Sequence, residues 1–148
     1  MTAIRKILVP VDLSTCSRLA LERALALADQ LKAHVTVFHV AELSPETAHL
    51  QLAEGGGGTL EEFAVKTARR ELEEFVKAPK ANAQQAFDVR VEAGRPRDRI
   101  LKRSEEGYDL IVMGTHGRTG RLHSLAGSVT ESVVRMASIP VLTVRASE

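Results

Sequence analysis

The feature that most limits how this chain can fold is a regular alternation of short apolar runs with longer amphipathic segments. The runs are rich in β-branched residues, as buried strands are, and the segments between them have helical spacing. Strands separated by helices pair in parallel through right-handed crossovers, so we predict an α/β fold with a five-stranded parallel sheet and helices on both faces. Strands are predicted at residues 4–12, His34–Val40, Phe87–Glu92, Leu110–Met113 and Val141–Arg145. Helices are predicted after Ser14, from Thr59 to about Ala78, from Pro96 to just before Gly107, and over Ser128–Met136.

The composition is that of one globular domain, residues 1–148, with few aromatic side chains. Four Phe, one Tyr and no Trp are too few for the aromatic rows that bind single-stranded nucleic acid. The net charge of +1 disfavours a broad nucleic-acid surface. The N-terminus lacks the pattern of a signal peptide, and no apolar run approaches the roughly 20 residues of a membrane helix. We therefore expect a cytoplasmic protein with no nucleic-acid or membrane partner.

The cysteine and histidine residues do not predict a metal site. Cys16 is the single cysteine, and His116 and His123 lie seven residues apart without an acidic or thiol partner at ligand spacing. His39 alternates within a predicted strand and is expected to be a hydrogen-bonded core histidine. The basic residues between Arg95 and Arg103 are diluted by acidic neighbours and are interpreted as a solvated helix face.

The strongest local signal is a glycine-punctuated segment after the fourth strand. Gly114 would allow a sharp turn at the strand end, and Gly117 a positive φ or a close approach. Gly127 and Ser128 fall where the next helix begins, so free backbone N–H groups would point into the crevice, with hydroxyl donors from Ser128 and Thr130. This pattern predicts a phosphate cradle made mostly of backbone, unlike a Walker loop. From the residues alone, simple turn chemistry is an equal alternative.

The spacing G-x2-G-x9-G-S, together with its flanks, resembles the universal stress protein family. The opening residues Lys6–Asp12 also match that family, as do Val37–Val40 and Ile139–Leu142. The likeness covers essentially the whole chain. It implies the strand order 3-2-1-4-5 of a Rossmann-like, adenine nucleotide alpha hydrolase-type fold. Because all three glycines and the serine are present, it further implies the subgroup that binds ATP.

The resemblance also implies roles for individual residues in nucleotide binding. Asp12 would bind the ribose hydroxyls, although a helix-capping role is the alternative. Arg118 and Arg121 could reach the phosphates by their position, or could be solvated loop charges. A Mg²⁺ ion would be held through the phosphates. The remaining expected contacts are Val40 at the adenine edge, Pro10 and Val11 as an apolar wall, Met113 and Gly114 at the ribose, and Gly117, Gly127, Ser128 and Val129 at the phosphates, with Thr130 beside them.

Two function hypotheses from different classes follow. The first is a binding module whose ATP occupancy regulates a stress response through an unknown regulatory protein partner. The second is a slow ATPase or nucleotide-transferring enzyme, which we rank lower because no lysine follows Arg103 and no positioned general base is evident. A purely structural dimer with an empty pocket is a third possibility. The expected strand order places Val141–Arg145 at a sheet edge, which predicts a homodimer, and the loop at Gly55–Gly58 could act as a lid.

Overall fold

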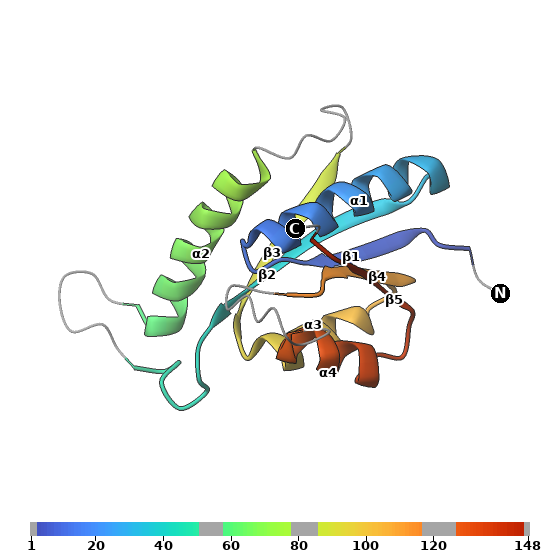
Figure 1. The fold of residues 1–148 in the computed structure, drawn as a ribbon. Coiled ribbons are helices and arrows are strands. Elements are labelled where there is room, and N and C mark those ends of the chain that lie inside the picture. The colour runs from blue at the N-terminus through green and yellow to red at the C-terminus, as the bar shows by residue number, and fades with distance from the viewer. Residues whose placement is uncertain (1–2, 51–57, 78–85, 117–126, 147–148) are drawn as a thin grey trace.

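The fold is a single parallel sheet with helices packed on both of its faces (Figure 1). The computed structural model describes residues 3–50, 58–77, 86–116 and 127–146. The predicted order of strands and helices is confirmed throughout this part of the chain. The strands are β1 (Lys6–Pro10), β2 (His34–Glu42), β3 (Phe87–Gly94), β4 (Leu110–Gly114) and β5 (Val141–Val144), and the helices are α1 (Thr15–Leu31), α2 (Leu60–Val76), α3 (Pro96–Ser104) and α4 (Ser128–Met136).

The strands are ordered β3-β2-β1-β4-β5, and every pair is parallel. The order expected from the resemblance is therefore confirmed, with β1 at the centre and β5 at one edge. The first strand is shorter than the predicted residues 4–12, because the chain leaves the sheet after Pro10 and passes through Leu13 at φ 69° to enter α1. The direction of chain growth across the sheet reverses beside β1. Open sheets bind ligands at such a point, beyond the carboxyl ends of the strands.

Two apolar clusters hold the helices against the sheet. Ile7 and Val9 of β1 pack with α1 and α2, whereas Leu8 between them packs with α3 and α4. Successive side chains of a strand point to opposite faces, and all three of these are fully buried. The alternation therefore places helices on both faces, as predicted. Within the described residues, no helix has the length and apolar character needed to cross a membrane.

Side-chain caps begin the two long helices where the sequence predicts them. The Ser14 hydroxyl accepts a hydrogen bond from the Ser17 N–H at 3.2 Å, and the Thr59 hydroxyl accepts one from the Glu62 N–H at 3.2 Å. Such caps satisfy backbone donors that have no partner within the helix. The caps fix where α1 and α2 start, and both starts lie at the carboxyl edge of the sheet.

Asp109 lies at the opposite end of the sheet, the amino edge, where the parallel strands begin. Its carboxylate accepts hydrogen bonds from the backbone N–H groups of Arg5 and Lys6 at 2.9 and 3.0 Å. These bonds, that from Arg5 first, hold the pKa of the Asp109 carboxyl below its usual value. The carboxylate therefore joins the start of β4 to the start of β1.

The lowered pKa of Asp109 predicts a pH-dependent contribution to stability. Because the folded pKa lies below the unfolded value of about 3.9, the contribution is fully present above about pH 5 and is lost as the pH falls through the folded pKa. We expect Asp109→Asn to lower Tm at pH 7 and the gap from the wild type to close in acid. Thermal melts from pH 7 to pH 3 measure this gap, and a gap that does not change with pH would contradict the prediction.

Candidate functional site

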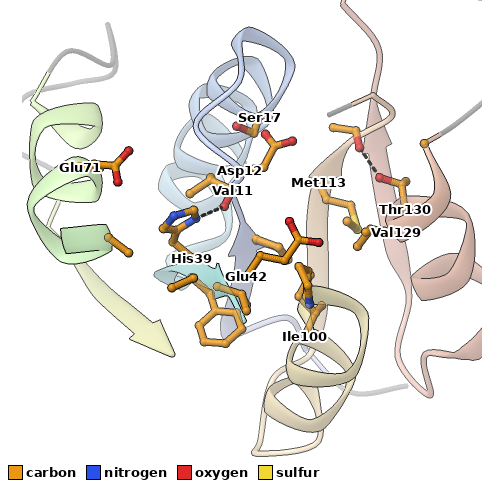
Figure 2. Close-up of a pocket in the computed structure, with 18 of the residues that line it drawn as sticks. Val11, Asp12, Ser17, His39, Glu42, Glu71, Ile100, Met113, Val129 and Thr130 are labelled. Atoms are coloured by element: carbon orange, nitrogen blue, oxygen red, sulfur yellow. Dashed lines mark hydrogen bonds between the residues drawn. The ribbon is translucent and has the colours of Figure 1, made fainter. Parts of the chain in front are cut away.

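A pocket of about 650 Å³ lies beyond the carboxyl ends of β1, β2 and β4. This volume is in the range of small-molecule sites. In Figure 2, α2 with Glu71 forms one side, and Met113, Val129 and Thr130 form the other, with Val11, Asp12 and His39 between them. The pocket therefore occupies the point of the sheet at which ligands are expected.

The pocket brings together every predicted site residue that the structure describes. These residues come from segments far apart in the sequence, at the ends of β1, β2 and β4 and at the start of α4. Gly117, Arg118 and Arg121 lie outside the described residues, as do His123 and Gly55–Gly57. The predicted residues that line the pocket are Pro10, Val11, Asp12, Val40, Met113, Gly114, Gly127, Ser128, Val129 and Thr130.

Gly114, at the end of β4, is required for a reason that the sequence did not reveal. Its φ is not positive, so the prediction of a sharp glycine turn does not explain it. Instead, a Cβ at this position would lie 2.8 Å from the Cys16 Sγ and 3.0 Å from the Cys16 backbone carbon and oxygen. Cys16 itself is buried and donates to the Val144 carbonyl at 3.4 Å. Gly114 thus permits the close approach of α1 to β4.

The first turn of α4 faces the pocket without a side-chain cap. Gly127 is the N-cap, at φ −68° and ψ 164°, and its own N–H donates to the Thr115 carbonyl. The next N–H groups belong to the first turn of α4, where a helix supplies no backbone acceptor. These donors and the positive end of the helix dipole favour an anion beside Gly127 and Ser128.

Thr130 does not have the role that the sequence analysis gave its hydroxyl. Its side chain is buried, and its Oγ1 donates to the Gly114 carbonyl at 2.7 Å (Figure 2). A hydroxyl has one proton to donate, so in this structure Thr130 cannot also donate to a phosphate. It joins the end of β4 to the start of α4 and holds the two sides of the cradle together.

Asp12 has a part in the turn into α1 as well as a place in the pocket. Its Oδ1 accepts a hydrogen bond from the Ser14 N–H at 3.0 Å, whereas the N-cap of α1 is Ser14 itself, so Asp12 holds the turn before the helix rather than capping it. The same side chain lines the pocket, where Figure 2 shows it beside Ser17. The two roles are compatible because a carboxylate accepts several hydrogen bonds.

His39 is a buried, hydrogen-bonded histidine, as predicted, and it also lines the pocket. Its Nδ1 lies 2.8 Å from the Val11 carbonyl oxygen, and only 7% of the residue is exposed. A carbonyl only accepts, so Nδ1 carries a proton and donates it to the Val11 carbonyl. The imidazole therefore fixes the end of β1 against β2.

Helix α2 forms a wall of the pocket that was not predicted from the sequence. Although this helix is rich in charged residues, one side of it lines the pocket. The signal was present as spacing, since these residues recur every three or four positions. The pocket-lining residues of α2 are Leu60, Phe63, Ala64, Thr67, Ala68 and Glu71.

The described pocket wall is largely apolar, and its carboxylates are accompanied by no lysine or arginine. Its carboxylates belong to Asp12, Glu42 and Glu71. Among the described residues, no group of three or more His, Cys, Asp or Glu side chains is arranged to hold a metal ion.

The basic face of α3 is more structured than the predicted solvated surface. The guanidinium of Arg103 donates to Glu92 of β3 and to Glu106, and only 19% of its side chain is exposed. The hydrogen bond to Glu92 raises the pKa of Arg103 above its usual value. Arg99 also lies 3.7 Å from Glu92. This cluster fixes α3 on the sheet rather than forming an open basic patch.

Comparison with known proteins places this geometry in a family. Residues 3–145 match the universal stress protein family. Two universal stress proteins of Methanocaldococcus jannaschii are 31% identical over 154 residues and 34% identical over 146 residues. Each match covers 95% of this chain, together with 94% of the first relative and 82% of the second.

Solved structures show the same fold. A universal stress protein, UspA, from Lactobacillus plantarum has a TM-score of 0.71 at 25% identity, covering 98% of this chain and 100% of that one. A universal stress protein in complex with cAMP has a TM-score of 0.65 at 24% identity, covering 99% and 100% of the two chains. The Archaeoglobus fulgidus protein in complex with dAMP has a TM-score of 0.51 at 21% identity, covering 97% and 99%. The sequence match over nearly the whole chain, together with the strand order, shows that this protein belongs to the universal stress protein family.

Proposed function

We propose that the protein binds ATP in this pocket and acts as a nucleotide-dependent regulatory module of a stress response. The observation that carries the proposal is the uncapped first turn of α4 at Gly127, which opens into a 650 Å³ pocket with an apolar wall. A nucleotide needs both features, because its phosphates require N–H donors and its base requires apolar surface. The solved cAMP and dAMP complexes of proteins with this fold agree with an adenine nucleotide.

Each part of the nucleotide has a proposed contact within the pocket. Asp12 would bind the ribose hydroxyls, and the backbone of Val40 would meet the edge of the base. The N–H groups of Ser128 and Val129 would bind the phosphates, with Gly117 and Arg118 from the adjoining loop. Met113, Gly114, Pro10 and Val11 would pack against the ribose and base, and Thr130 would hold the cradle in shape.

A Mg²⁺ ion would bind through the phosphates rather than in a protein cage. Among the described residues the pocket wall has carboxylates but no lysine or arginine, so in this proposal α4, the cation and Arg118 would neutralise the phosphate charge. The ion would supply charge neutralisation and order the phosphate chain. Within this proposal ATP is a regulatory ligand, and an unidentified regulatory protein would recognise the occupied state.

Thermal unfolding with and without nucleotide tests the proposal. A ligand that binds only the folded state stabilises it by about 2.7 kcal/mol at a hundredfold excess over Kd. For a domain of this size, this corresponds to a rise in Tm of roughly 5–10 °C. We expect this rise with ATP and Mg²⁺, and a smaller one with ATP and EDTA. The absence of any rise in magnesium buffer would refute the proposal.

We also propose that two copies pair through β5. This strand lies at the sheet edge, and its Leu142 side chain is 43% exposed. An edge strand presents unpaired backbone groups, which a second copy related by a two-fold axis would satisfy. The Pro140 carbonyl accepts from the Ile111 N–H of β4, and the Val144 carbonyl from the Thr115 N–H just after β4. Backbone groups alternate in direction along a strand, so those of Thr143, one residue from Val144, face outward.

Thr143→Pro is therefore the variant expected to break the dimer. It removes an outward N–H while leaving the hydrogen bonds between β4 and β5 in place. Light scattering should give twice the 16.1 kDa chain mass for the wild type and a single chain mass for the variant. Thr143→Val, which keeps the N–H, should remain dimeric. A wild-type protein with the mass of one chain at micromolar concentration would overturn the pairing.

A further inference from the structure

The two ends of the pocket differ in chemistry, as do the two ends of a nucleotide. One end is the first turn of α4, whose N–H groups have no acceptor within the helix. The other is the wall of α2, which Figure 2 shows across the strand ends from Met113, Val129 and Thr130. A ligand with one anionic and one aromatic end can match both only in a single orientation.

The N-terminal half of α2 exposes apolar surface to the pocket. The C-terminal half packs on the core through Leu72, which is fully buried, and Phe75, which is 7% exposed. The N-terminal half instead places Leu60, Phe63 and Ala64 on the pocket wall, and Phe63 is 54% exposed. An aromatic ring left this exposed on a pocket wall offers contact area to a ligand that enters the pocket.

The charge on the α2 wall disfavours phosphate there. The Glu71 carboxylate lies on the same stripe of α2 as Phe63, and the described pocket residues provide no lysine or arginine to offset it. Like charges repel most strongly where water is partly excluded. The phosphates are therefore directed toward α4, and the other end of the ligand toward α2.

We propose that the phenyl ring of Phe63 stacks on the base of the bound nucleotide and so fixes its orientation in the pocket. This inference rests on the proposed function and adds the base-binding residue on α2. Every base has a π-face, so Phe63 supplies affinity for any nucleobase without choosing among them. The ligand class is a nucleoside triphosphate whose base lies between β2 and α2.

A tryptophan reporter tests the contact directly. The chain contains no tryptophan, so the emission of Phe63→Trp comes from position 63 alone. We expect ATP with Mg²⁺ to quench this emission and inorganic tripolyphosphate, which has no base, to leave it unchanged. The control is Leu31→Trp, because Leu31 is 42% exposed at the last residue of α1, toward the amino edge of the sheet. Its emission should not respond to ATP.

Affinity measurements separate stacking from simple apolar contact. Phe63→Ala should weaken ATP binding by about five- to a hundredfold, the range of base–aromatic stacking, and leave tripolyphosphate binding unchanged. Phe63→Leu keeps apolar area without a π-face and should bind nearly as weakly as Phe63→Ala. Both variants should fold, since the side chain is mostly exposed and alanine and leucine favour helix.

The outcomes distinguish this inference from the proposed function. If ATP stabilises the wild type but binds Phe63→Ala equally well, or if Phe63→Leu binds like the wild type, stacking is overturned and ATP binding stands. If ATP does not stabilise the wild type, the proposed function is overturned, and the stacking with it. Quenching of Phe63→Trp by ATP together with weak binding by both other variants supports the contact.

Discussion

Replacing Gly127 with valine is expected to abolish the rise of roughly 5–10 °C in Tm that ATP with Mg²⁺ should give the wild type. Gly127 is the N-cap of α4, beside the N–H groups that would bind the phosphates. A branched side chain there would occupy the space that the phosphates need. At φ −68° and ψ 164°, the backbone is in the extended region that valine adopts readily, so the chain should still fold.

The matched control for Gly127→Val is Ser138→Val, which adds the same side chain at an exposed position beyond the other end of α4. Valine is a poor N-cap, so Gly127→Val should itself lower the Tm of the free protein by an amount equivalent to about 1 kcal/mol. The test therefore compares, for each variant, the rise in Tm between the free protein and the protein with ATP and Mg²⁺. If ATP raised the Tm of Gly127→Val by as much as that of the wild type, α4 would not contact the nucleotide.

The second large effect is expected at Gly114. Gly114→Ala places a Cβ within 2.8 Å of the Cys16 Sγ and 3.0 Å of the Cys16 backbone. Overpacking of this kind costs about 1–3 kcal/mol, or roughly 2–4 °C of Tm for each kcal/mol in a domain of this size. Urea unfolding of the free protein measures the loss, and stability equal to that of the wild type would show that α1 moves away at little cost.

A double variant separates the two parts of this clash. Cys16→Ala removes the Sγ but leaves the backbone atoms in place. In the Cys16→Ala background, Gly114→Ala should therefore still destabilise, though by less than in the wild type. A double-mutant cycle of the four proteins gives the coupling between the two positions. Complete rescue by Cys16→Ala would mean that the thiol alone requires the glycine.

The sequence predicts the layers of this fold better than it predicts the contacts within the site. The apolar runs of β1 and β4 identify buried strands because burial on both faces leaves few polar positions. The order of the strands came from the family resemblance, since local patterns do not encode which strands are neighbours. The segments that form the site were predictable from the parallel sheet. The carboxyl ends of parallel strands meet at one edge, and the motif residues directly follow those strands.

The errors at the site come from contacts between segments far apart in the chain. Thr130 was expected to face a phosphate, but its hydroxyl bonds the carbonyl of Gly114, sixteen residues earlier. Gly114 was interpreted as a turn, but its neighbour is Cys16 on another helix. In α2, glutamates and lysines obscured the stripe that contains Phe63. A local sequence pattern does not indicate which distant residue a side chain will contact in the folded protein.

The bonds of Asp109 have a consequence for how this scaffold can diversify. The carboxylate joins β1 to β4 at the amino edge of the sheet, where the Lys6 Nζ also lies 4.6 Å from the centre of the Tyr108 ring. The pocket lies at the opposite edge and uses none of these groups. The bonds that hold β1 to β4 at this edge are thus made by residues that do not line the pocket. Substitutions at the pocket edge can retune recognition while the amino-edge bonds preserve the architecture, which makes the scaffold evolvable.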